Sequence, residues 1–284
     1  MNEGKRLGII GGGRAAWALG SAWLRAGGAI EGVHLRPGSG SSLPELLDAP
    51  PLPIDALASR SESILLAIPD SAIPPMAREL TRITPPAAWL IHASGSLPSS
   101  VFGDRERRLA LHPLRALPLA PTPTDFSGAL FIAEGPEPAI SFARDFVTAL
   151  GATLLTIGPE EKPRYHAAAV IASNLMAALL EIATETMAKS GLPEQSVRPA
   201  IAELARSAID NWSRGEGGHR FTGPVARADQ GTIESHLLAL AGEPDHAELY
   251  RRLSIEVAKA CRTEGRDQAE VSRIIAFLRA QTLS

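Results

Sequence analysis

The sequence predicts an α/β protein in which a parallel sheet, with helices on both of its faces, precedes an all-α region. Three observations support this fold class. Short apolar runs alternate with helical patterns in the first half of the chain. A glycine-rich loop joins the first predicted strand to the first predicted helix. Strand patterns end after Ile157, so we expect two domains, residues 1–158 and residues 159–284.

Short apolar runs predict the strands of the first domain, at residues 6–10, 30–35, 63–68, 89–92, 109–111, 130–133 and 153–157. Between the first two strands, apolar residues recur three or four positions apart from Ala15 to Ala26, which predicts one apolar helix face against the sheet. Gly27 and Gly28 end that helix. A connector rich in serine and proline is expected at residues 38–53.

The second domain begins with an Ala-rich stretch that predicts one helix of about 30 residues, with Pro163 near its start and Gly191 as its stop. Ser173 and Asn174 interrupt the apolar run before it reaches the roughly 18 residues that a membrane span needs. We therefore expect a buried helix whose core residues include Met176, Leu179 and Leu180. Further helices are predicted at residues 197–213, 232–240, 245–261 and 267–280, with a site-forming or merely exposed loop at residues 214–231.

Composition excludes several classes of protein. Hydrophobic residues make up 45% of the chain and charged residues 21%, which is a globular balance. The formal net charge of -3 offers no basic field for nucleic acid. The single cysteine, Cys261, excludes an internal disulfide and a multi-thiolate metal site, and we expect it to be buried in a helix. Without a recognisable secretion signal, we expect a cytoplasmic protein with no metal and no membrane or nucleic-acid partner.

A glycine-rich loop follows the first predicted strand directly. Gly11, Gly13 and Ala16 occupy the positions of the G-x-G-x-x-G/A pattern, immediately before an amphipathic helix. Small residues there permit a tight turn, a close approach of the backbone to a pyrophosphate, and close packing of helix on strand. The pattern predicts a Rossmann domain that binds a dinucleotide through Gly11, Gly12, Gly13, Arg14, Ala15 and Ala16. The alternatives are a plain turn and another adenosine-containing cofactor.

The second strand indicates which dinucleotide is bound. In NAD-binding domains an acidic residue near its end accepts the ribose 2′-hydroxyl, and this sequence has none there. Arg36 stands in that region instead, and it is followed by Ser39, Ser41 and Ser42, which together could hold the 2′-phosphate of NADP. The sequence therefore predicts NADP as the cofactor. The alternative is that Arg36 is a solvated arginine in a flexible loop.

Residues that follow the other strands are candidates for the rest of the site, because ligands of open α/β sheets bind beyond the carboxyl ends of the strands. After one strand come Ile68, Pro69 and Asp70, which we expect to contact the cofactor. Asp70 and the neighbouring Ser71 could instead cap the next helix.

Two further strand ends carry candidates for chemistry. Ser94 is a predicted catalytic residue and Ser96 a predicted substrate contact. His112 ends the next strand, immediately before Pro113, and an imidazole of near-neutral pKa at that place is a candidate general acid or base. A core histidine is the alternative for His112. His92 lies inside its strand and is expected to be structural.

The long helix contributes a polar seam to the predicted cleft. Lys162, His166 and Ser173 lie within about 40° of one stripe, and Asn174 lies about a quarter turn away. We expect His166 and Asn174 to act in catalysis and Lys162 and Ser173 to bind the substrate. The alternative is a half-exposed helix face. Loop 214–231 either folds over the ligand or forms a polar turn between helices, and the substrate contacts expected from it are Thr222, Gly223 and Pro224.

Six segments, in chain order, resemble the Rossmann-like family that carries the domain of unknown function 2520: GGGRAA, AIPDSAI, HASGSLP, LHPLRAL, LGATLLTIGPEEKPRYHAAAVIASN and FTGPVARAD. The resemblance covers nearly the whole chain, and it is specific because the segments occur together. It implies a Rossmann domain followed by a helical dimerisation domain similar to that of 6-phosphogluconate dehydrogenase. It also implies similarity to pyrroline-carboxylate reductases and to other oxidoreductases that use NADP or a deazaflavin.

A more distant similarity is to prephenate dehydrogenase, in which a serine after one strand and a histidine in an HP motif contact the substrate. Ser94 and His112 match those positions. The arginines of such a site cannot be assigned in this chain, so the similarity does not extend to the substrate. One departure from the family pattern is Ala228, which stands in FTGPVARAD where the family usually has glycine.

The leading hypothesis for function is an oxidoreductase that transfers a hydride between NADP(H) and a small carbonyl, imine or hydroxyl compound bound between the domains. A second hypothesis is a non-catalytic protein that senses NADP(H) through the same loop. A third is a methyltransferase, which Arg36 disfavours because such folds also place an acidic residue at the ribose. The helices of the second domain offer more apolar surface than a lone small bundle needs, which predicts a homodimer formed through that domain.

Overall fold

The computed structural model describes residues 5–118, 122–214, 221–263 and 267–281. Strands of this part form one seven-stranded sheet in the order β2-β1-β3-β4-β5-β6-β7. They are β1 (Arg6–Ile10), β2 (Ala29–His34), β3 (Ser63–Leu66), β4 (Trp89–His92), β5 (Arg108–Leu114), β6 (Leu130–Glu134) and β7 (Thr153–Thr156). Because β2 and β3 lie on opposite sides of β1, a ligand crevice is expected beyond the carboxyl ends of β1 and β3.

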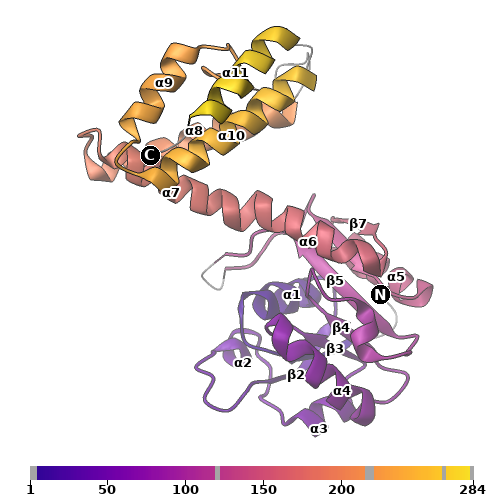
Figure 1. Cartoon of the computed structure of the whole chain (residues 1–284). Helices are drawn as coiled ribbons and strands as arrows, with labels where there is room; N and C mark the ends of the chain where they lie inside the picture. Colours follow the sequence, from indigo (N-terminus) through magenta and orange to yellow (C-terminus); the bar gives the residue numbers. More distant parts are fainter. Residues whose placement is uncertain (1–4, 119–121, 215–220, 264–266, 282–284) are drawn as a thin grey trace. The chain divides into compact units, whose positions relative to one another are not determined.

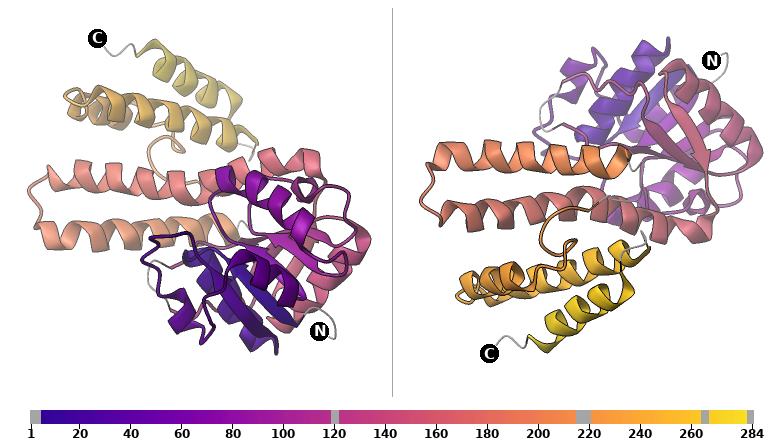
Figure 2. Two further views of the ribbon diagram at one scale, coloured as in Figure 1. Left: turned by 90° about the horizontal axis from the view of Figure 1, so that it is seen from below. Right: turned by 90° about the horizontal axis from the view of Figure 1, so that it is seen from above.

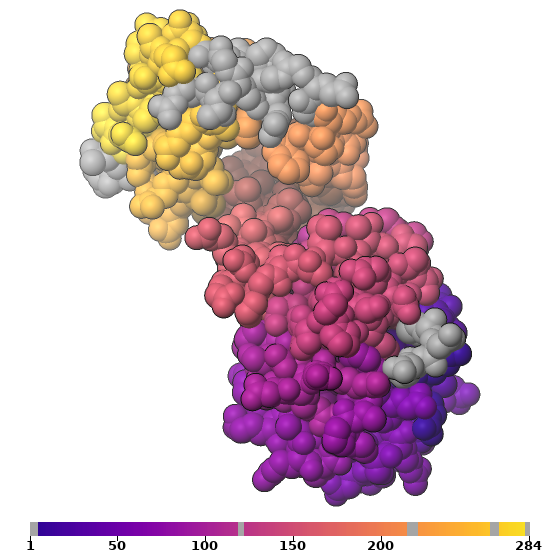
Figure 3. Space-filling model, turned by 90° about the vertical axis from the view of Figure 1, so that its right-hand side faces the viewer, coloured from indigo at the N-terminus to yellow at the C-terminus, as the bar shows by residue number. Residues whose placement is uncertain are grey.

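Helices cover both faces of the sheet (Figure 1). One apolar cluster contains residues of α1 (Arg14–Arg25), α2 (Leu43–Leu46) and α5 (Glu137–Ala149), and another contains residues of α3 (Ile54–Arg60) and α4 (Ile73–Ile83). The strands alternate between them, since Leu65 of β3 lies in the first cluster and Ile64 and Leu66 lie in the second. The predicted doubly wound α/β fold is confirmed. In the space-filling view of Figure 3, the indigo to magenta segments of this fold pack closely together.

All seven predicted strands are present, most of them within two residues of the predicted ends. The sheet departs from an all-parallel one at a single pairing, because β6 pairs antiparallel with β5 from Ala110 to Leu114. β5 consequently continues past His112 and Pro113, where the sequence predicted its end. Proline is tolerated there because β5 pairs with β4 only as far as Ala110, so the missing N–H leaves no bond of that ladder unmade.

The chain divides into two compact units, Met1–Asn174 and Leu175–Ser284. The first unit includes the start of the long helix that the sequence predicted. This helix consists of α6 (Lys162–Val170), a π-helical turn (Ile171–Leu175) and α7 (Met176–Ala188). α6 is therefore part of the unit that contains the sheet, although the sequence suggested a division after residue 158. Single π turns inside α-helices occur frequently at functional sites.

The second unit is helical, as predicted. It contains α7, α8 (Glu194–Arg214), α9 (Gln230–Ala239), α10 (Pro244–Thr263) and α11 (Gln268–Ala280). α7 and α8 lie side by side in both views of Figure 2. A small apolar core joins α9, α10 and α11, with Ile233, Ala258 and Ile274 among its buried residues. Cys261 is buried in α10, as the sequence predicted.

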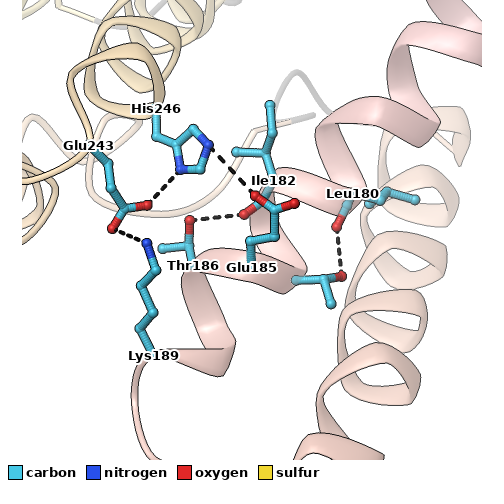
Figure 4. A network of polar contacts seen from close by, with 8 residues as sticks. Leu180, Ile182, Glu185, Thr186, Lys189, Glu243 and His246 are labelled. Atoms are coloured by element: carbon cyan, nitrogen blue, oxygen red, sulfur yellow. Dashed lines mark hydrogen bonds and ion pairs between the residues drawn. The ribbon is translucent and has the colours of Figure 1, made fainter.

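A polar network joins the end of α7 to the start of α10 (Figure 4). The Glu243 carboxylate accepts from Lys189 Nζ at 2.8 Å and from His246 Nδ1 at 2.7 Å. His246 Nε2 lies 3.9 Å from Glu185 Oε2. The hydrogen bond from Lys189 is the main reason why the pKa of Glu243 is lowered. Because Lys189 and Glu185 are exposed, these contacts contribute little to the stability of the protein.

α7 has no buried side chain within the part of the chain that the structure describes. The expectation that Met176, Leu179 and Leu180 are core residues is therefore wrong for a single chain, and Leu179 is 38% exposed. By length and composition alone the segment Pro159–Ala188 could cross a membrane, although one such helix is only a weak indication. An exposed apolar helix face of this size usually marks a surface that contacts another protein or a membrane. The described part of one chain does not cover it.

Candidate active site

The glycine loop between β1 and α1 has the shape that a pyrophosphate site requires. Gly11 has a φ of +117°, and a Cβ on it would lie 2.3 Å from the carbonyl oxygen of Ala67, so no other residue fits. Gly13 is the N-cap of α1, and a Cβ on it would meet no atom within 4 Å. The first turn of α1 has neither an acidic residue nor a side-chain cap. Its free N–H groups therefore face space that an anion can fill.

The loop after β2 supports this turn. Ser41 Oγ donates to the Gly12 carbonyl at 2.8 Å and accepts from the Leu43 amide at 3.2 Å, so this hydroxyl positions the glycine loop. Arg36 begins a turn that the Ser39 amide closes at 3.1 Å. The Arg36 side chain is exposed and makes no ion pair with any residue that the structure describes. Both interpretations of Arg36 from the sequence, a phosphate ligand and a solvated loop arginine, fit this geometry.

Three side chains form a chain of hydrogen bonds beyond the carboxyl ends of β3 and β4. Ser96 Oγ donates to Asp70 Oδ2 at 2.6 Å, and Ser94 Oγ lies 3.3 Å from Ser96 Oγ. Because the Ser96 hydroxyl proton points to the carboxylate, Ser94 is the donor in the second contact. Asp70 therefore links two strand ends, and no described side chain caps the short 3-10 turn that begins at Asp70.

Ser94 is held at each of its polar atoms. Its amide donates to His92 Nδ1 at 3.2 Å, its Oγ accepts from the amides of Ser96 and Leu97, and its carbonyl accepts from Lys162 Nζ at 3.4 Å. His92 is itself completely buried, and its Nε2 lies 3.2 Å from the Pro98 carbonyl, so it serves the loop structurally, in agreement with the sequence analysis. These bonds fix the conformation of the loop after β4, residues 93–99, and this loop forms a platform at the end of the sheet.

Lys162, a predicted substrate contact, is fully enclosed at the start of α6. Its hydrogen bond to the Ser94 carbonyl is its one polar contact with a residue that the structure describes, and it forms no ion pair with such a residue. Burial lowers the pKa of this amine, while the charges of Glu134 and Asp70 oppose the shift. In this structure Lys162 braces the platform, and its charge reaches neighbouring groups through space.

Two imidazoles meet beside the platform. The rings of His112 in β5 and His166 in α6 have centroids 5.8 Å apart and are nearly perpendicular, at 86°. Gly95 packs against both, because a Cβ on it would lie 2.5 Å from His166 Nδ1 and 3.3 Å from His112 Cε1. His166 Nδ1 is enclosed and has no hydrogen-bond partner among the residues that the structure describes. An enclosed nitrogen of this kind is better tolerated as a lone pair than as an N–H, which places the proton of neutral His166 on Nε2.

The third member of this cluster is Tyr165, whose hydroxyl lies 2.6 Å from His112 Nδ1. Burial lowers the pKa of His112 to about 4, with smaller contributions from the positive charges of His166 and Lys162. The near-neutral pKa expected from the sequence is therefore wrong, since the strand position that aims the ring also withdraws it from water. Burial raises the pKa of Tyr165 to about 12, so the phenol keeps its proton.

The remaining predicted residues are not bonded to this cluster in the described structure. Ser173 Oγ donates to the Ala169 carbonyl at 2.7 Å, and Asn174 is exposed. The π-helical turn that contains them changes the angular phase after His166, which is why a stripe drawn at ideal helical spacing does not describe their positions. A turn before α9 in the second unit contains the other three, Thr222, Gly223 and Pro224.

The sequence patterns did not single out Tyr165, Gly95 or Glu134. Tyr165 is three residues after Lys162, a spacing that places both on one helix face, and this was the available signal. Gly95 stands between two predicted site serines, but the approach of the imidazoles to it depends on residues far along the chain. Glu134 is a buried carboxylate that accepts from Ser99 Oγ at 2.9 Å and from the Ser99 amide. It anchors the far end of the platform.

Comparison with known families agrees with this architecture. Residues 129–257 match the family described as a domain of unknown function (DUF2520), and residues 2–114 match a Rossmann-like domain. The resemblance seen in the sequence is confirmed. No protein of curated function shows significant similarity to this chain.

Solved structures of several proteins share the fold. A candidate NADP oxidoreductase from Bacteroides fragilis is 24% identical with a TM-score of 0.73, over 89% of this chain and 97% of that one. A protein from Thermotoga maritima is 24% identical with a TM-score of 0.70, over 92% and 100%. Pyrroline carboxylate reductase from Plasmodium falciparum, solved with NADP bound, is 13% identical with a TM-score of 0.56, over 97% and 98%. At these identities the likeness shows the fold.

Proposed function

We propose that this protein is an NADP-dependent oxidoreductase that transfers a hydride between NADP(H) and a small carbonyl, imine or hydroxyl compound. The observation that carries the proposal is the open space at Gly13, at the uncapped start of α1. A pyrophosphate is favoured there by the free N–H groups and by the positive end of the helix dipole. The NADP that is bound to the pyrroline carboxylate reductase of the same fold supports this assignment.

Different residues of this chain would bind different parts of the cofactor. Gly11, Gly12 and Gly13 would contact the pyrophosphate together with the first turn of α1, which supplies Arg14, Ala15 and Ala16. Arg36 would pair with the 2′-phosphate. The end of β3 would border the dinucleotide with Ile68, Pro69 and Asp70. Bound NADP(H) supplies or accepts the hydride.

The polar cluster supplies the groups for proton transfer in this proposal. His112 is the group that exchanges a proton with the substrate, and His166 lies beside it. The hydroxyls of Ser94 and Ser96 are engaged with each other and with Asp70, so a substrate would bond to them by exchanging partners. Asn174 stays a proposed catalytic residue, and Ser173, Thr222, Gly223 and Pro224 stay proposed substrate contacts. Lys162 stays a proposed substrate-binding residue, which from its enclosed position would act on the substrate through its charge.

The test is a titration of the purified protein with NADPH and with NADH, followed by assays of NADPH oxidation with carbonyl and imine compounds. We expect tighter binding of NADPH. Arg36→Ala should weaken NADPH about ten- to a hundredfold, since a charge-assisted contact contributes roughly 1.5 to 3 kcal/mol, and it should leave NADH binding unchanged. Arg82→Ala, at an exposed arginine in the last turn of α4, is the matched control. Equal affinity of the wild type for both dinucleotides would refute the assignment.

We also propose that the protein is a cytoplasmic homodimer formed through its second domain. Large apolar side chains of that domain are exposed, with Leu175 directly before α7 at 55% exposure, and Leu204 and Trp212 on α8 at 63% and 57%. Leu204 and Trp212 are eight residues apart on α8, about 80° around the helix, so both fit within one broad apolar stripe. A second copy of the same helices would cover this surface in a symmetric contact.

A further inference from the structure

We propose that Tyr165 and His112 form a proton relay, in which the neutral imidazole gives its Nε2 proton to a substrate oxygen while its Nδ1 takes the phenol proton of Tyr165. This inference rests on the proposed reductase function and adds to it the source of the proton. Tyr165 acts through His112 and is therefore a positioning residue that also stores the proton.

The direction of the hydrogen bond follows from its length and from acidity. Contacts donated by O–H are about 2.5 to 3.0 Å long, whereas those donated by N–H are about 2.7 to 3.2 Å, and the distance from Tyr165 Oη to His112 Nδ1 is 2.6 Å. A phenol is also a stronger acid than a neutral imidazole N–H, and an imidazole nitrogen is a stronger acceptor than a phenol oxygen. Tyr165 is therefore the donor, and His112 has its proton on Nε2.

The second nitrogen of His112 is the one that a ligand can reach. Nε2 makes no hydrogen bond with a described residue, and it is not among the enclosed polar atoms that lack a partner, whereas Nδ1 of the adjacent His166 is. The edge of the ring between its two nitrogens packs near Gly95, since His112 Cε1 would lie 3.3 Å from a Cβ there. The ring is thus held by Tyr165 on one nitrogen and open on the other.

A relay explains how His112 could deliver a proton although it is uncharged near neutral pH. Its pKa of about 4 means that an imidazolium is not available as the acid. When a carbonyl carbon gains a hydride, the electron pair of the C=O π bond moves to oxygen, which takes the proton from His112 Nε2. The Nδ1 atom takes the Tyr165 proton in the same step, so the imidazole stays neutral and a phenolate remains. To restore both groups, the Nδ1 proton returns to the phenolate, and solvent water gives a proton to Nε2 in the place that the substrate has left.

The relay is energetically downhill in the direction of reduction. The pKa of Tyr165 is about 12, which lies below that of an alcohol, whose hydroxyl is about as weakly acidic as water at roughly 16. Oxidation of an alcohol would use the same path in reverse and would need the phenolate first. Near neutral pH the protonated Tyr165 can therefore supply the proton for reduction directly, whereas oxidation has to begin from the phenolate.

The first test needs no cofactor and no substrate, so it separates this inference from the proposed function. Protein labelled with ¹⁵N-histidine would be examined by NMR at neutral pH, with the His112 signals assigned by their loss in His112→Asn. We expect Nε2 to be protonated and Nδ1 to be unprotonated and hydrogen-bonded. Tyr165→Phe should shift the Nδ1 resonance. Tyr250→Phe is a matched control, because the Tyr250 hydroxyl lies 2.9 Å from Nδ1 of another histidine, His236. It should leave His112 unchanged.

The second test uses turnover once a substrate is found. A plot of the wild-type rate against the fraction of D₂O in mixtures with H₂O should be curved, because two protons move in the same step. For Tyr165→Phe the plot should be linear. The same variant should lower kcat about ten- to a hundredfold and leave NADPH affinity unchanged, because it removes the proton store of a general acid. A proton on Nδ1 in the wild type, or a linear isotope dependence in the wild type, would overturn the relay.

Discussion

Both ring nitrogens of His92 contact the backbone of the loop that follows β4. The residue is completely buried at the end of β4, where Nδ1 accepts from the Ser94 amide and Nε2 faces the Pro98 carbonyl. Both bonds require the neutral ring, with the proton on Nε2. Burial is the largest cause that lowers the pKa of His92 to about 4, and the charge of Lys162 adds to it. Folding therefore holds this histidine in its uncharged form.

The consequence is a loss of stability in mild acid. The folded-state pKa of His92, about 4, lies below its ordinary value of 6.5, so between these values the unfolded chain binds more protons than the folded one. The stability is complete above about pH 6.5 and is lost as the pH falls towards 4, by about 3 kcal/mol for this group. Urea unfolding at pH 7, 5.5 and 4.5 measures this loss, to which His112 adds in the same window.

His92→Asn separates the contribution of this residue. The Asn side-chain oxygen can accept from the Ser94 amide in place of Nδ1, but it does not titrate, so the variant should be less stable at pH 7 and less sensitive to acid. His236→Asn, at an exposed histidine of α9, controls for loss of an imidazole as such. If the free energy of unfolding of His92→Asn depends on pH as strongly as that of the wild type, protonation of His92 does not destabilise the folded protein.

At the scale of elements, the turn before α9 contains a strained residue. Ala228 has a φ of +56°, a left-handed conformation that costs an L-residue with a Cβ roughly 1 kcal/mol. The family resemblance implies glycine at this position. The next residue, Asp229, caps α9 by accepting from the Thr232 amide at 3.1 Å, so the strained turn is held by the cap and by the fold around it.

Ala228→Gly should therefore stabilise the protein by about 0.5 to 1 kcal/mol, because relief of the left-handed strain exceeds the entropy that glycine adds to the unfolded chain. Thermal or urea unfolding measures the change. Ala226→Gly, at a buried residue of the same turn without a positive φ, should destabilise it instead. If both glycines destabilise equally, the packing of the Ala228 methyl group matters more than its backbone.

The elements themselves were largely predictable, because strand runs and helix faces are local patterns. The antiparallel pairing of β6 was not, since it depends on which edge of the sheet the chain returns to. The site was predictable only in part. His112, Ser94 and Asp70 follow from the rule of strand ends, but the contact of Tyr165 with His112 joins residues 53 positions apart. Likewise, an Ala-rich apolar helix does not reveal whether its cover comes from its own chain.

At the scale of the whole molecule, the exposed apolar face of α7 and α8 determines the oligomeric state that we expect in solution. We expect light scattering at micromolar concentration to give about twice the chain mass of 29.9 kDa, because a symmetric contact would bury the stripe that contains Leu204 and Trp212. Changing both to glutamate should yield monomers, since like charges would meet across a desolvated surface. Arg206→Ala, at an exposed residue of the same helix, should leave the mass unchanged. A wild-type mass near 29.9 kDa would contradict the dimer, and association with detergent micelles or lipid vesicles would point instead to the membrane that the composition of Pro159–Ala188 permits.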